Sequence, residues 1–364
     1  MVTGEGAASA AKALLLGTVG GVTAFLLSFP APFLTGPVLV VAVAGLLGQK
    51  LSVPDRVRDL CFMIIGMTMG AGVSPEVLET VVRWPLSFAG LALGLLVIIF
   101  LGRWVFMTVW HYDQATATLA SMPGHLSYVI GISTETEADV AKISVIQSMR
   151  VVALTLVVPF AVMLIGFQDD IALPPRTPMP LGALLICLAG AAILGAGLRR
   201  TNLQVAYLIG GMLMTSTTHL AGWFEGAVPM WLAGPSFVAM GTIIGTRFSG
   251  QSLADLRRAS IAGVTFTVIA FAVASAAALL VSALLDMPAA LLLIAFAPGG
   301  VEAMAAMALA LGADPAFVAA HHVFRLFLLV FLAPASLSLG GRLQDWRVSR
   351  ERSPGTNDRQ EPDR

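Results

Sequence analysis

The chain has 364 residues, of which 57% are hydrophobic and only 12% are charged, and its mean hydropathy is +0.87. A soluble protein carries about 25% charged residues, so this composition excludes a soluble globular protein and predicts one whose surface is covered by the lipid bilayer. The formal net charge is zero, which gives no sign of nucleic-acid binding. The two cysteines, Cys61 and Cys187, stand outside any CxxC or Cys/His motif, so neither a disulfide framework nor a zinc site is expected. We expect no cofactor.

Apolar runs of membrane-spanning length follow one another along the whole chain. A helix needs roughly 20 apolar residues to cross about 30 Å of hydrocarbon. The runs of the first half are 12–29, 33–49, 58–73, 85–110, 114–136 and 140–166. Those of the second half are 180–198, 204–222, 232–248, 259–285, 289–313 and 315–339. We therefore expect an all-α membrane protein with a first repeat at 10–170, a second repeat at 178–340 and a disordered cytoplasmic tail at 341–364.

The two halves align without a gap over most of their length when the chain is shifted by 175 residues. Shared Leu or Val would mean little in so apolar a chain, but shared Arg, Asp, Pro and Gly are informative. The matched pairs are Gly36/Gly211, Gly66/Gly241, Gly70/Gly245, Arg83/Arg258, Pro123/Pro298, Gly124/Gly299, Asp139/Asp314, Arg150/Arg325 and Pro159/Pro334. Such matches at one offset indicate an internal duplication.

The positions of Lys and Arg predict that the second half is inverted relative to the first. Cations in short loops stay on the cytoplasmic side. In the first half they lie between the second and third runs, and in the second half they follow the first and third runs. These cations are Lys50, Arg56 and Arg58 in the first half, and Arg199, Arg200, Arg247, Arg257 and Arg258 in the second. Arg83 fits this pattern poorly.

An inverted repeat requires an odd number of crossings in each half, so one of the six runs should enter and leave on the same side. Both termini are then expected to be cytoplasmic. Arg342, Arg347 and Arg350 of the tail agree with this orientation.

The fifth run of each half is the candidate for this re-entrant segment. It is interrupted by Met122-Pro123-Gly124-His125 in the first half and by Ala297-Pro298-Gly299-Gly300 in the second. Proline removes a backbone donor and glycine opens the left-handed region, so each helix should break there. Each arm of about 8–10 residues would reach about half the membrane. The pattern predicts two hairpins whose tips meet near the midplane, although a broken span or a plain kinked helix would also fit.

Two arginines lie about 15 Å deep in the last run of each half. Arg150 and Arg325 each cost about 2.5–3.5 kcal/mol at the centre of a membrane helix, so each must have something to bind. They either bind or gate an anion, or they hydrogen-bond to carbonyls freed at the breaks and lock the core. We take as candidate substrate-binding residues Pro123, Gly124, His125, Arg150, Pro298, Gly299, Gly300 and Arg325, and as candidate coupling or gating residues Gln147, Glu302 and His322.

Two further pairs have expected structural roles. Gly66-x-x-x-Gly70 and its counterpart at Gly241 and Gly245 are typical of helices that pack closely, and could also let a flexible third span approach a substrate. Asp139 and Asp314 stand just before the last run of each half and are expected to cap its helix.

The paired Met-Pro-Gly and Ala-Pro-Gly-Gly signatures resemble those of the AbrB family of bacterial membrane proteins. An Ala-Asp at 138–139 and 313–314 and an Arg in a long apolar helix follow each signature, and the resemblance covers roughly residues 10–340. His125 replaces the second glycine of the usual first signature. The resemblance implies a transporter, although members also carry labels such as ammonia monooxygenase or regulator of gene expression. The layout is also similar to that of sodium-coupled glutamate and hydroxycarboxylate carriers, which does not transfer a substrate.

Four functions compete on these observations. Five scattered histidines do not supply the metal cluster that an oxygenase needs, so we do not expect an enzyme. A membrane regulatory or accessory protein linked to gene expression, or a channel built on re-entrant hairpins, stays an alternative. The main expectation is a secondary transporter of a small, anionic solute that works by alternating access, with its site between the two Pro-Gly tips. A homodimer is compatible with such a carrier, but no motif in the sequence requires one.

Overall fold

The computed structural model describes residues 4–71, 84–124, 129, 132–133, 136–164, 177–200, 206–250 and 253–351. The helices of the first half are α1 (Gly4–Leu26), α2 (Pro32–Leu46), α3 (Asp55–Gly70), α5 (Trp84–Thr108), α6 (Gln114–Ala120) and α8 (Val140–Leu164). Those of the second half are α9 (Leu181–Arg199), α10 (Ala206–Leu220), α11 (Met230–Gly245), the short 3₁₀ helix η2 (Thr246–Phe248), α12 (Leu253–Leu285), α13 (Ala289–Phe296), α14 (Val301–Ala310) and α15 (Pro315–Glu351). An isolated bridge joins Pro178 and Ala227.

Six of these helices are long and apolar enough to cross a bilayer, so the chain is an all-α, multi-pass membrane protein. The spans are Gly6–Leu26, Trp84–Thr108, Val140–Leu164, Leu181–Arg199, Ala259–Leu285 and Pro315–Leu337. Four further helices, α2, α3, α10 and α11, have 15 or 16 residues. At 1.5 Å per residue each extends roughly 22–24 Å, less than the hydrocarbon thickness. Five full crossings in each half therefore stay a prediction.

The helix bounds of the two halves recur at the spacing of 175 residues found in the sequence. Helices α3 and α11 begin at 55 and 230 and end at 70 and 245, while α8 and α15 begin at 140 and 315. The same local signals stand at the equivalent starts, because Pro54 and Pro229 occupy the N-cap positions of α3 and α11. The last helix continues to Glu351, into the segment expected to be a disordered tail. The domain boundaries at 10–170 and 178–340 stay predictions.

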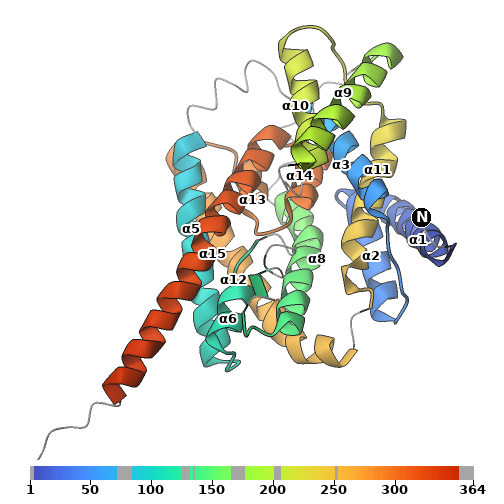
Figure 1. Ribbon diagram of the computed structural model, residues 1–364. Coiled ribbons are helices and arrows are strands. Elements are labelled where there is room, and N and C mark those ends of the chain that lie inside the picture. The colour runs from blue at the N-terminus through green and yellow to red at the C-terminus, as the bar shows by residue number, and fades with distance from the viewer. Residues whose placement is uncertain are drawn as a thin grey trace, which may run out of the picture.

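The helices form two groups, each containing elements of both halves (Figure 1). The six-helix group consists of α1, α2 and α3 from the first half and α9, α10 and α11 from the second. The break group consists of α5, α6, α8 and α12 to α15, and it contains both Pro-Gly segments. The groups meet where α2, α3 and α11 contact α8 and α14. In Figure 1 the C-terminal end of α15 projects away from the rest of the bundle.

Glycines let the six-helix group pack backbone against backbone. A Cβ atom added at Gly66 of α3 would overlap the backbone of Leu208 on α10, and one added at Gly241 of α11 would overlap the backbone of Leu34 on α2. The first half thus packs on the second through two equivalent contacts. This confirms the close-packing role predicted for these glycines.

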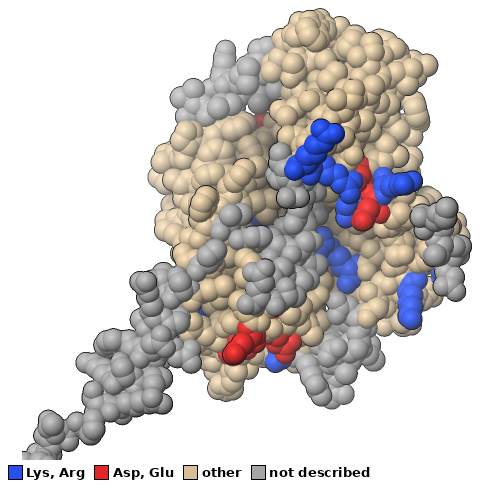
Figure 2. Space-filling view, in the orientation of Figure 1, with Lys and Arg blue, Asp and Glu red and all other residues tan. Residues whose placement is uncertain are grey.

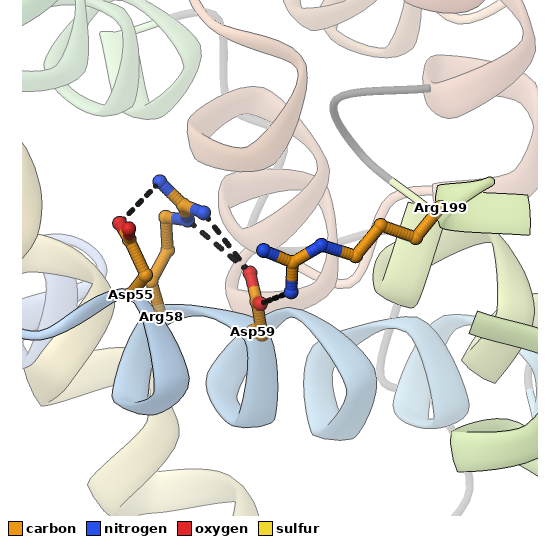
Figure 3. A network of polar contacts seen from close by, with 4 residues as sticks. All are labelled: Asp55, Arg58, Asp59 and Arg199. Carbon is orange, nitrogen blue, oxygen red and sulfur yellow. Dashed lines mark hydrogen bonds and ion pairs between the residues drawn. The ribbon is translucent and has the colours of Figure 1, made fainter. Parts of the chain in front are cut away.

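Charged side chains occupy small patches of a surface that is otherwise uncharged in the view of Figure 2. One patch joins the two halves at the start of α3 and the end of α9 (Figure 3). Asp59 accepts from Arg199 at 2.6 Å and from Arg58 at 3.1 Å, and Arg58 also pairs with Asp55 at 2.9 Å. The network therefore places the cation-rich end of α9 beside the cation-rich start of α3.

Candidate functional site

The helices of the break group are interrupted at both Pro-Gly segments. Helix α6 ends at Ala120, and residues 122–124 are not helical, while α13 and α14 are separated by residues 297–300. At each break a glycine N–H donates to the carbonyl two residues earlier: Gly124 to Met122, and Gly299 to Ala297, both at 2.8 Å. The turn has the same backbone bond in both halves, so the sequence signature folds locally in the same way.

Each buried arginine holds the break of its own half. The two Nη atoms of Arg150 donate to the carbonyls of Met122 and Gly124, both at 3.2 Å. The two Nη atoms of Arg325 donate to Ala297, at 2.8 Å, and to Gly299. Both guanidinium groups are almost fully buried. Of the two roles weighed from the sequence, binding of the freed carbonyls is the one that these contacts show, and binding of an anion stays a prediction.

The candidate coupling residues Gln147 and His322 make different contacts, although they are equivalent in the repeat. Nε2 of Gln147 lies within hydrogen-bond distance of three carbonyls at the first break, the closest being that of Met122 at 2.8 Å. Nδ1 of His322 instead lies 3.0 Å from the carbonyl of Val318 in its own helix. Because a carbonyl only accepts, this nitrogen carries the ring hydrogen in the neutral form.

Two polar atoms at the first break are buried and have no hydrogen-bond partner among the described residues. They are Oε1 of Gln147 and Nε of Arg150. One is an acceptor and the other is a donor that carries part of a positive charge. Buried polar groups normally have partners, so unsatisfied atoms at this place mark a position for a polar ligand or water.

Both breaks border one small cavity, to which Pro123, Pro298 and Arg325 all contribute. Its volume is about 10 Å³, enough for roughly one water molecule. Apolar side chains of α5 and α12, such as Leu95 and Ala277, form the rest of its wall. The two Pro-Gly breaks therefore lie close together, in an arrangement with no room for an organic solute between them, and re-entrant hairpins stay a prediction.

For three of the predicted site residues, His125, Glu302 and Gly300, the structure describes no side-chain contact at the breaks. His125 lies outside the described residues. Glu302 lies in the first turn of α14, but its side chain is not described. Gly300 is the N-cap of α14, and no side-chain hydrogen bond caps this helix. Among the described residues, no three His, Cys, Asp or Glu side chains lie close enough to bind a metal.

The aspartates before α8 and α15 cap these helices as predicted. The carboxylate of Asp139 accepts from the N–H of Lys142 at 3.0 Å, and that of Asp314 accepts from the equivalent N–H of Phe317 at 3.2 Å. The N–H of Asp139 also donates to Oγ1 of Thr116 at 2.8 Å. The chain thus returns after the first break to the level at which α6 begins.

Sequence reasoning missed a buried polar contact between α5 and α15. Oγ of Ser87 lies 2.8 Å from Nε2 of His321, and both side chains are fully buried. The rings of Phe88 and Phe317 lie 4.4 and 4.0 Å from the imidazole, centroid to centroid. No local pattern could have indicated this pair, because 234 residues separate its members.

Comparison with known proteins places this architecture in a family. The model of the family described as "Transition state regulatory protein AbrB" matches residues 6–339. The chain belongs to the AbrB family. Bacillus subtilis (strain 168) has a relative named "Uncharacterized protein YhjN", 27% identical over 75% of this chain and 75% of that protein. Escherichia coli (strain K12) has one named "Putative regulator AbrB", 25% identical over 84% of this chain and 89% of that protein. This agrees with the family resemblance in the sequence.

Proposed function

We propose that this AbrB-family protein is a secondary transporter of a small organic anion, with its site between the two Pro-Gly breaks. The observation that carries the proposal is the pair of equivalent breaks, each held by a buried arginine, that border one cavity. Interrupted helices at membrane depth are tolerated where they are buried in protein or line a cavity. In secondary transporters such breaks form the substrate site.

The charge of the site favours an anion. Arg150 and Arg325 are buried, and no carboxylate among the described residues forms an ion pair with Arg150. The start of α14 faces the second break without a side-chain cap, and the N-terminus of a helix attracts negative charge. An anion between the breaks would use the free Nε of Arg150 and would balance its guanidinium charge.

The arrangement of the helices supports an inverted repeat. Ser9 near the start of α1 lies 3.1 Å from the carbonyl of Lys50, and the N–H of Leu51 donates to Ser249 after α11 at 2.6 Å. With the pairing of Asp59 and Arg199, these contacts bring the start of α1, the α2–α3 loop and the ends of α9 and α11 to one side. That side carries most of the loop cations, so we assign it to the cytoplasmic side of a bacterial inner membrane. Both termini are then cytoplasmic. The bond between Asp139 and Thr116 supports a hairpin at the first break.

The test is stabilisation of the purified protein by a panel of carboxylates, amines and amino acids. A ligand stabilises by RT ln(1 + [L]/Kd), or about 2.7 kcal/mol at 100 times Kd. We expect at least one carboxylate to stabilise the wild type but neither Arg150→Gln nor Arg325→Gln. Arg103→Gln is the control, because Arg103 lies near the end of α5 and makes no hydrogen bond or ion pair among the described residues. Equal stabilisation of all four proteins would contradict an anion site at the arginines.

The family description and the name of the Escherichia coli relative favour a second candidate, a regulatory membrane protein. The two functions make different predictions for proteoliposomes that contain this protein alone. A carrier accumulates a stabilising carboxylate when an imposed ion gradient drives its uptake, and this uptake is lost in Arg325→Gln. A regulator binds the ligand without uptake. A homodimer also stays a proposal, to be tested by the mass of the detergent-solubilised protein.

A further inference from the structure

A larger cavity lies where the six-helix group meets the break group. Its volume is about 410 Å³. It is lined by the starts of α2 and α11, the ends of α1, α3 and α14, and the segment before α11; its residues include Phe33, Thr68, Ala233, Phe237 and Leu309. Thr68 and Ala233 belong to the six-helix group, whereas Leu309 is near the end of α14 in the break group. The cavity is thus at the boundary between the groups and not inside either one.

The cavity lies on the side of the protein opposite to the cations. Helix α2 lines the cavity with its first turn, and Lys50 follows its other end. Helix α3 lines it near its end with Thr68, while Arg58 is in its first turn. Helix α11 lines it near its start with Ala233, and Arg247 follows its other end. Three helices therefore agree on the side to which this cavity belongs.

Helix α14 connects the cavity with the small site between the breaks. Its first residue, Val301, follows the second break, and Leu309, one residue before its end, lines the larger cavity. Ten helical residues extend about 15 Å, so the two places lie at opposite ends of one short helix. A solute that passes from the larger cavity to the breaks would move along α14.

The lining limits the chemistry of a solute that can occupy the larger cavity. Nearly all of it is apolar, and the hydroxyl hydrogen of Thr68 is used in a 2.8 Å bond to the carbonyl of Ile64. A solute that is polar on every side would lose its hydration here without gaining partners. A solute with an apolar body gains from the Phe33 and Phe237 walls. The starts of α2 and α11 have no side-chain cap, which favours a negative over a positive head group.

We propose that the 410 Å³ cavity is the binding site through which a carboxylate with an apolar body gains access to the protein, from the side opposite to the cations. This inference rests on the proposed carrier function for its direction of transport. The cavity itself is a claim that can be tested without any transport.

The test uses a protein whose only cysteine is Thr68→Cys, with Cys61 and Cys187 replaced by alanine. Thr155→Cys is the matched control: Thr155 makes the same 2.8 Å bond to the carbonyl four residues earlier, in the middle of α8, and is fully buried. A charged, membrane-impermeant thiosulfonate is added to vesicles of known orientation. Thr68→Cys should react at least ten times faster than Thr155→Cys when the reagent is on the side opposite to the cations, and should not react from the other side. Ala233→Cys, also in the cavity wall, should repeat the result if Thr68→Cys is not folded.

Octanoate, octylamine and acetate then serve as probes of the solute class. Octanoate at submillimolar concentration should slow the labelling of Thr68→Cys several-fold, and the other two should not. Equal reactivity of Thr68→Cys and Thr155→Cys would overturn the cavity as an access site. If octylamine protects Thr68→Cys as well as octanoate does, the proposed preference of the cavity for a carboxylate is wrong. If octanoate protects Thr68→Cys but no ligand gives a stabilisation that depends on Arg150 and Arg325, this inference is upheld and the proposed carrier site fails. If a ligand gives that stabilisation but octanoate does not protect Thr68→Cys, only this inference fails.

Discussion

Replacement of Arg150 by glutamine tests whether the arginines hold the breaks. The change removes two charge-assisted hydrogen bonds, to Met122 and Gly124. The carbonyl of Met122 keeps two other donors at 2.8 Å, the side chain of Gln147 and the N–H of Gly124. The carbonyl of Gly124 has no second donor among the described contacts, so the substitution leaves one buried acceptor without a partner among the described residues. Such a group costs about 1–3 kcal/mol, which is the expected loss in the free energy of unfolding.

Denaturant titration of the purified protein in detergent measures this loss. Arg103→Gln is the control, because it makes the same chemical change at a half-buried position without a described polar contact, and it should change stability by less than about 0.5 kcal/mol. Hydrogen exchange should accelerate most around residues 119–124, next to the orphaned carbonyl. The reasoning is refuted if Arg150→Gln and Arg103→Gln are equally stable, or if exchange increases evenly over α8.

Two further predictions concern the packing and the caps. Gly66→Ala should destabilise the protein by about 1–3 kcal/mol, because its Cβ would overlap the α10 backbone, whereas Gly182→Ala, with open space around it, should cost nothing in the same titration. The caps should respond to pH in opposite ways. Burial opposes ionisation of Asp139, but the hydrogen bonds and charge of Lys142 outweigh it and hold its pKa below the usual range, so its contribution to stability is present at pH 7 and lost as the pH falls through that pKa. Burial raises the pKa of Asp314, so its ionised form weakens the fold as the pH rises through that pKa. Unfolding at pH 7 and at a pH below the lowered pKa of Asp139 should therefore show Asp139→Asn less stable than wild type, by under about 1 kcal/mol, only at pH 7, and Asp314→Asn more stable there; the same pH dependence in both variants would contradict this account.

The sequence predicted elements best where a local signal determines them. Pro54 and Pro229 stop one element and start another, and Asp139 caps α8, so the helix starts follow from neighbouring residues. It could not predict that α10 (Ala206–Leu220) is shorter than the apolar run 204–222 that contains it, since hydropathy does not distinguish a helix from an adjoining apolar turn. The left-handed Ala31 before α2 is such a turn.

Only part of the candidate site could be predicted, because only part of it depends on local signals. The depth of Arg150 and Arg325 showed that each needed a partner, and the carbonyls of the breaks were among the expected partners. Which atoms they bind follows from the packing of α8 and α15 beside their own breaks, which no local pattern encodes. The cavity between the two helix groups depends on contacts between α3, α11 and α14, far apart in the sequence, and was not predicted at all.

The contacts of the arginines determine which parts of the protein can move together. Arg150 joins α8 to the first break and Arg325 joins α15 to the second, so both breaks are attached inside the break group. The glycine contacts and the pairing of Asp59 with Arg199 instead connect the two halves inside the six-helix group. A displacement between the groups would therefore leave both sets of bonds intact and change mainly the boundary that contains the 410 Å³ cavity. Because packed helices shift as rigid bodies more easily than they deform, this boundary is where the proposed carrier would open and close.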